Sequence, residues 1–115
     1  MMNEYTPTDI ILHKKSRTLE ILFNTGERFI LPCEYLRVHS PSAEVRGHGI
    51  GNEKLVLNKE HVNILAIEPV GQYAIKPIFS DGHQSGIYSW KTLYELGKHQ
   101  VANWQRYIEK VNNTK

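Results

Sequence analysis

The apolar residues of this 115-residue chain change their spacing at Ser89, and that change constrains the fold more than any other feature. Before Ser89, apolar and polar side chains alternate over short runs, which is the period of strands that bury one face. After Ser89, apolar side chains recur every three or four residues, which is the period of amphipathic helices. The sequence therefore predicts an α+β domain with a small antiparallel β-sheet of hairpins and C-terminal helices packed on it.

The clearest hairpin lies near the N-terminus. Leu19, Ile21 and Phe23 alternate with polar residues, and Gly26 follows in a segment with the residue types of a tight turn. Pro77 interrupts a later apolar run and lacks the N–H that a ladder needs, so part of that strand is expected at an edge or a bulge. Strands are expected over residues 9–13, 18–23, 28–31, 62–67, 73–79 and 86–88.

Two helices are expected at the C-terminal end. Ser89 has the side chain of a helix N-cap, and Gly97 is of the type that ends helices. Between them, Trp90, Leu93 and Tyr94 share one face. The second helix carries an apolar stripe formed by Val101, Trp104, Ile108 and Val111.

The segment over residues 31–51 fits neither a long helix nor a simple strand. Pro32 can open a short helix at its first position, and Ser40-Pro41 is expected to end it because a residue before proline avoids the helical region. Glycines at alternate positions 47, 49 and 51 then predict an irregular connection.

Length and charge limit the classes of protein that this chain can represent. We expect one domain over residues 1–115, with a core over about 9–111 and frayed ends. A net charge of +2 gives no support to a nucleic-acid or membrane partner. One cysteine excludes an internal disulfide, and no apolar run resembles a signal peptide or a membrane span. We expect a cytoplasmic monomer or weak dimer.

No pattern of an enzyme is present. Ser40, Ser42 and Ser85 lie near histidines in the sequence, but no G-x-S-x-G segment surrounds them. The glycine-alternating segment at 47–51 lacks the lysine of a phosphate-binding loop. The chain is therefore predicted not to be an enzyme.

Soft metal ligands occur in the irregular segments, but their spacing matches no common site. No C-x-x-C, no paired histidines on a helix and no H-x-D are present. Cys33 in a short apolar helix is typical of a small buried side chain. We expect no cofactor, and the alternative is a zinc or iron site formed by Cys33, His39, His48 and His83.

Three longer motifs resemble a known family. They read L-P-C-E-Y-L-R-V-H-S-P-S-A-E-V-R-G-H-G, I-E-P-V-G-Q-Y-A-I-K-P-I-F-S-D-G-H-Q-S-G-I-Y-S-W and L-Y-E-L-G. Together they resemble the small domain at the N-terminus of γ-butyrobetaine and trimethyllysine hydroxylases, and most strongly its stand-alone bacterial branch, a domain of unknown function. The resemblance covers residues 10–107. A similar module occurs in plastid iron–sulfur ATPases.

The resemblance implies a zinc site that this chain has lost. In the hydroxylases three cysteines and one histidine hold the metal, and the cysteine positions fall here on Ser40, Ser42 and Val45. Only His83 of the D-G-H motif is retained, and hydroxyl and isopropyl groups do not replace thiolates. We expect the two serines to hydrogen-bond within their own loop and His83 to point into the same loop.

The resemblance and the residues together predict a non-catalytic accessory or docking module, with a protein partner and a place in iron–sulfur or other metal metabolism. The alternatives are a metal-binding protein and a docking subunit of a separate 2-oxoglutarate/iron oxygenase, whose iron chemistry this chain lacks because it has no H-x-D. The expected surface for an anionic ligand or partner is Arg37, His39, Arg46, His48 and His83. A solvated basic edge is the plainer interpretation of the same residues.

Overall fold

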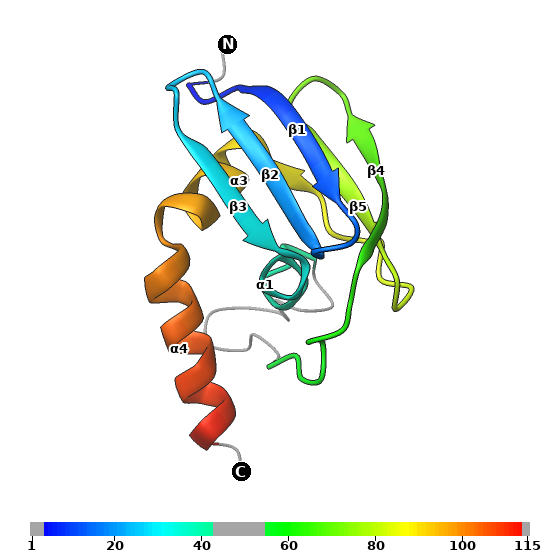
Figure 1. The fold of residues 1–115 in the computed structure, drawn as a ribbon, viewed down its shortest axis with the longest axis vertical. Coiled ribbons are helices and arrows are strands. Elements are labelled where there is room, and N and C mark those ends of the chain that lie inside the picture. Colours follow the sequence, from blue (N-terminus) through cyan, green and yellow to red (C-terminus); the bar gives the residue numbers. More distant parts are fainter. Residues whose placement is uncertain (1–3, 43–54, 114–115) are drawn as a thin grey trace.

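The computed structural model describes residues 4–42 and 55–113. Their strands form two three-stranded antiparallel sheets, with the C-terminal helices beside them (Figure 1). This confirms the predicted α+β class. The first sheet contains β1 (Pro7–His13), β2 (Thr18–Phe23) and β3 (Arg28–Pro32) in that order. The second contains β4 (Ile64–Val70), β5 (Ala74–Phe79) and β6 (Tyr88–Ser89) in that order. The helices are α1 (Cys33–Val38), α3 (Trp90–Lys98) and α4 (Gln100–Asn113).

The first sheet follows the predicted alternation. Leu19, Ile21 and Phe23 on β2 point into the core and are at most 1% exposed. Gly26 adopts a φ of +89° in the turn before β3, which a side chain would oppose. The hairpin predicted from this stretch is therefore confirmed.

The second sheet differs from the prediction at its ends. β4 begins at Ile64 because Val62 lies in a turn, where its N–H donates to the Lys59 carbonyl at 3.1 Å. It continues through Pro69, which an edge strand tolerates because one side of its ladder is unpaired. Residues 86–88 were predicted as a strand, but only Tyr88 and the following serine pair with β5.

Pro77 lies where the prediction placed it, at a local edge. It pairs with Ile67 of β4 on one side, whereas β6 covers only Ala74 and Ile75 on the other side of β5. The missing N–H of Pro77 therefore removes no hydrogen bond between β5 and β6.

The core lies between the two sheets and receives side chains from α1 and α3. It contains Leu19, Ile21, Phe23, Leu31, Cys33, Tyr35, Leu36, Val62, Ile64, Ile75, Phe79, Tyr88, Leu93 and Leu96. No helix within the described ranges 4–42 and 55–113 is long and apolar enough to span a bilayer.

Helix α3 begins as predicted but does not end as predicted. The Ser89 hydroxyl accepts the Thr92 N–H at 3.1 Å and caps the helix. Gly97 was expected to end the helix, and this is wrong because α3 continues to Lys98. A side chain at Gly97 would place its Cβ 2.4 Å from the Phe29 ring, so the glycine allows close packing of α3 against β3.

Helix α4 keeps three of the four residues of the predicted stripe, because Trp104, Ile108 and Val111 are half-buried. Val101 is 85% exposed, so its predicted place on the packed stripe is wrong. Tyr107 is buried instead, and its ring stacks on Trp104 with centroids 5.1 Å apart. The helix extends away from the sheets and passes beside α1 (Figure 1), so only part of its length meets the core.

Candidate functional site

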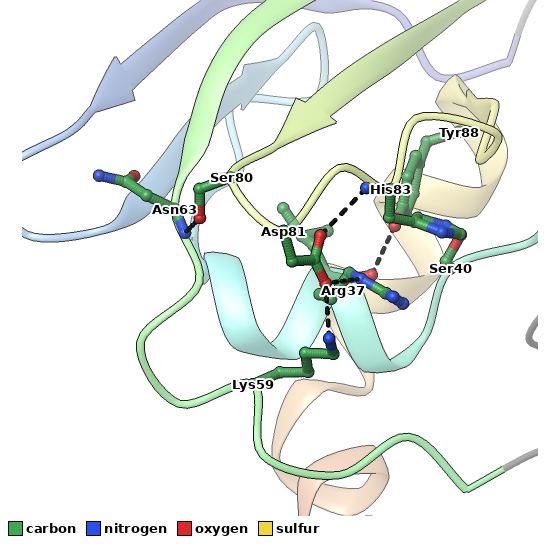
Figure 2. A network of polar contacts seen from close by, with 9 residues as sticks. Arg37, Ser40, Lys59, Asn63, Ser80, Asp81, His83 and Tyr88 are labelled. Carbon is green, nitrogen blue, oxygen red and sulfur yellow. Dashed lines mark hydrogen bonds and ion pairs between the residues drawn. The ribbon is translucent and has the colours of Figure 1, made fainter.

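The candidate site lies where α1 and the residues after it approach the connection from β5 to β6 (Figure 2). The connection opens with the tight turn predicted at residues 80–83. Gly82 has a φ of +93° and donates its N–H to the Phe79 carbonyl at 3.0 Å. The Phe79 N–H donates to the His83 carbonyl at 3.0 Å. This turn aims the side chains of Asp81 and His83 toward α1 (Figure 2).

Asp81 is the centre of a charged group. Its Oδ2 accepts from Arg37 Nε at 2.8 Å and from Lys59 Nζ at 2.7 Å. Its Oδ1 accepts the His83 backbone N–H at 3.1 Å. Burial alone would raise the pKa of Asp81, but the hydrogen bonds from Lys59, the His83 N–H and Arg37 outweigh it and lower that pKa to about 2. We call Arg37, Lys59 and Asp81 the charge triad.

The charge triad contains two cations and one carboxylate. The Arg37 side chain is 11% exposed and the Lys59 side chain is 24% exposed. Arg37 Nη1 is buried, and no acceptor for it lies in the described part of the chain. The triad therefore carries an excess positive charge and one unsatisfied donor.

Serines and a histidine form a second group next to the triad. Ser40 Oγ and His83 Nε2 share a hydrogen bond of 2.9 Å, and the two residues are only 1% and 7% exposed. The Ser42 N–H donates to Ser40 Oγ at 3.3 Å, and the hydroxyls of Ser42 and Ser85 are 2.7 Å apart. The contacts expected of Ser40 and His83 are thus present, whereas the Ser42 hydroxyl contacts Ser85 of the β5–β6 connection. We call these four residues the serine–histidine cluster.

The serine–histidine cluster does not have the donor set of a zinc site. His83 supplies one imidazole, but Ser40 and Ser42 supply neutral hydroxyls, which are poor zinc ligands. Val45 lies outside the described residues. Over residues 4–42 and 55–113, no three of the His, Cys, Asp and Glu side chains come together in a way that could hold a metal ion.

The alternative metal ligands lie in separate surroundings. Cys33 is fully buried, and its thiol contacts Asn63 Oδ1 at 3.8 Å. His39 Nδ1 hydrogen-bonds the Tyr35 carbonyl at 2.9 Å, and its ring lies beside the Tyr107 ring. Burial lowers the pKa of His39.

Of the residues expected to form one binding surface, the structure brings two together. Arg37 and His83 meet through Asp81, whereas His39 faces the aromatic side chains of α1 and α4. Arg46 and His48 lie outside the described residues. Their place in a surface stays a prediction.

Two members of the site were missed from the sequence. Lys59 belongs to no motif, and its partner Asp81 lies more than 20 residues away along the chain. Tyr88 donates its hydroxyl to the Leu36 carbonyl and is fully buried, which raises its pKa. The only signal for Asp81 was its position in the D-G-H motif.

The site combines a buried serine–histidine pair with a partly exposed charged group. The distance between Ser40 Oγ and His83 Nε2 is that of a nucleophile and its general base. Both residues are buried too deeply for a substrate to reach. The side chains of Lys59 and Asp81 are both partly exposed, at 24% and 21%, and Lys59 shares the Asp81 carboxylate with Arg37.

Comparisons with known proteins agree with this fold. The family model described as "Gamma-butyrobetaine hydroxylase-like, N-terminal" matches residues 10–94. One NMR solution structure is 50% identical to this chain in sequence and has a TM-score of 0.83. The matched region covers 99% of this chain and 87% of the chain in that structure. A second is 43% identical, with 97% and 88% coverage and a TM-score of 0.85.

A crystal structure from Acidithiobacillus ferrooxidans is also similar. It is 36% identical to this chain in sequence and has a TM-score of 0.68. The matched region covers 80% of this chain and 92% of the chain in that structure. That protein is described as having unknown function and belonging to the DUF971 family. No curated protein sequence matches the chain.

Proposed function

Because the chain belongs to the family of γ-butyrobetaine hydroxylase-like N-terminal domains, we propose that it is a non-catalytic module that docks onto a partner protein. The docking group is the charge triad of Arg37, Lys59 and Asp81. The ligand is an acidic segment of the partner, which supplies the carboxylate that the triad lacks.

The observation that carries this proposal is the sharing of one carboxylate oxygen by two cations. Arg37 and Lys59 both bond Oδ2 of Asp81, and the buried Nη1 of Arg37 has no acceptor among residues 4–42 and 55–113. A second carboxylate near Lys59 would restore charge balance, and a guanidinium favours carboxylate partners. The burial of Ser40 and His83 supports a structural role for these two residues beside the triad.

The family's description gives the first partner to test. It places such domains at the N-terminus of γ-butyrobetaine hydroxylase-like proteins. An iron-dependent oxygenase, or an iron–sulfur protein, is therefore the kind of partner that we propose. The module itself would act without a cofactor.

A titration with an acidic peptide tests the docking group. We expect acetylated, amidated tetra-glutamate to perturb the amide resonances near Lys59 in a two-dimensional NMR spectrum, and tetra-lysine to leave them unchanged. Lys59→Gln should weaken this binding about two- to fivefold, the range of an exposed ion pair. Added salt should weaken binding to the native chain more than to the variant.

Lys76 provides a matched control. It is a partly exposed lysine on β5 that pairs with Glu68 at 3.1 Å, away from the triad. Lys76→Gln should leave the affinity for tetra-glutamate unchanged. Equal losses in both variants, or no loss in either, would show that the peptide responds to general charge and that the triad is not the docking group.

A further inference from the structure

A groove of about 380 Å³ lies between the start of α1 and the first turns of α4. Pro32, Glu34 and Tyr35 line one side, and Val101, Trp104 and Gln105 line the other. These two segments are more than 60 residues apart in the sequence, so the groove exists only once α4 has packed beside α1.

The groove is mainly apolar, and two hydrogen bonds hold the Tyr35 hydroxyl at its base. The Tyr35 hydroxyl donates to the Leu96 carbonyl at 2.6 Å and accepts from Asn103 Nδ2 at 3.1 Å. The Tyr35 and Trp104 rings meet edge to face, with centroids 6.4 Å apart. Val101 leaves 85% of its surface in solvent at the groove. An exposed apolar side chain beside an aromatic floor can hold an apolar group of a ligand.

Negative charge lies at Glu34, which lines the groove, and at the neighbouring Glu60. Glu34 has neither a hydrogen bond nor an ion pair with its side chain among residues 4–42 and 55–113, and the same holds for Glu60. Burial raises the pKa of Glu34, the neighbouring charge of Glu60 raises it further, and His61 lowers it. The pKa of Tyr107 is raised by burial and then by the same two glutamates. Glu34 and Glu60 thus place two carboxylates close together beside the groove.

We propose that this groove binds a protein segment in which a lysine or arginine flanks an apolar side chain. The apolar side chain lies against Val101 and Trp104, and the cation lies at the carboxylate of Glu34. Charge complementarity selects this partner, because an acidic or neutral segment would leave Glu34 unpaired. The site goes beyond the charge triad, whose excess charge has the opposite sign.

Short peptides with blocked ends test the proposal on the full chain. Acetyl-Lys-Leu-Lys-amide should shift the Trp104 indole N–H resonance and saturate in the millimolar range, as expected for a ligand of this size. Acetyl-Glu-Leu-Glu-amide lacks the cations and acetyl-Lys-Gly-Lys-amide lacks the apolar side chain, so both should bind several-fold more weakly. Trp90, at the other end of the helical region, provides an internal reference resonance.

Two glutamate variants separate the groove from general charge. Glu34→Gln should weaken acetyl-Lys-Leu-Lys-amide about two- to fivefold, while Glu95→Gln, at an exposed position of α3, should leave the affinity unchanged. Lys59→Gln should also leave it unchanged, so failure of this site and failure of the charge triad are distinguishable.

Three results would overturn the proposal. The first is equal binding of the three peptides. The second is equal affinity of Glu34→Gln and Glu95→Gln. The third is a Trp104 resonance that shifts with protein concentration alone, because the occupant would then be a second copy of the chain.

Discussion

Ser40 shows how one residue can take a structural role through its burial. Its hydroxyl contacts His83 across 43 residues of sequence and accepts the Ser42 N–H as well. Both partners are almost free of solvent, so neither could regain a bond to water if the other were removed. The hydrogen bond therefore joins the end of α1 to the connection between β5 and β6.

Ser40→Ala tests the value of this bond. We expect it to lower the free energy of unfolding by about 1–3 kcal/mol, the usual cost of leaving a buried polar group without its partner. Urea unfolding would measure the change. Ser16→Ala removes a hydroxyl from an exposed turn and should change stability by less than about 0.5 kcal/mol. A Ser40→Ala effect as small as that of Ser16→Ala would refute the structural role.

Asp81 predicts a dependence of stability on pH. Its pKa is about 2 in the folded chain and about 3.8 in its ordinary range, so the folded state favours the charged form. The resulting stability is present above the ordinary pKa and is lost as the pH falls toward 2. Asp81→Asn should therefore be less stable than the native chain by about 1–2 kcal/mol at neutral pH.

Urea unfolding of both proteins over a series of pH values would follow this difference. The gap between native and Asp81→Asn stability should narrow as the solution is acidified and nearly close at the lowest pH. A gap that stays constant would mean that the charge of Asp81 does not contribute.

Not every residue of the site was predictable. Arg37 and His83 were predicted to belong to the site because they are basic side chains within the two long motifs. Lys59 was not, because its role depends on a contact with Asp81 that no local pattern records. His39 was assigned to the same surface, but it follows Arg37 by two residues, which is about 200° around a helix, and its ring meets Tyr35 instead.

At the scale of elements, α3 shows that a local preference can yield to packing. Gly97 has the residue type of a helix end, but α3 continues to Lys98, and the glycine instead leaves room for the Phe29 ring of β3. Alternation in β2 and the N-cap at Ser89 were predictable because both depend on neighbours in sequence. The packing of Gly97 depends on a distant strand.

Gly97→Ala tests this packing. Alanine has the higher helix propensity by about 1 kcal/mol, yet its Cβ would approach the Phe29 ring to 2.4 Å. We expect a net destabilisation of about 1–3 kcal/mol, typical of overpacking. Thermal unfolding would measure the change in stability. The reverse substitution Ala102→Gly, at an exposed position of α4, measures the difference in helix propensity without a change in packing. A more stable Gly97→Ala protein would contradict the close contact.

At the scale of the whole molecule, the sequence predicted the class of fold but not its division into two sheets. The strands and helices were predictable because the spacing of apolar residues differs between them. The pairing of β6 with β5 and the packing of one sheet against the other depend on contacts between distant segments. The same is true of the groove between α1 and α4. The charge triad, the serine–histidine cluster and the groove all lie around α1, which makes this short helix the centre of the proposed docking surface.

We propose that hydrogen bonds of the serine–histidine cluster, and not a bound metal, hold the segments around α1 in place for docking. The most direct test is the urea midpoint of the native chain in excess zinc and in chelator, with His83→Ala beside it. A metal that binds only the folded state raises the midpoint. We predict the same midpoint in zinc and in chelator, and a lower one for His83→Ala in both. A higher midpoint in zinc that disappears in His83→Ala would contradict the account.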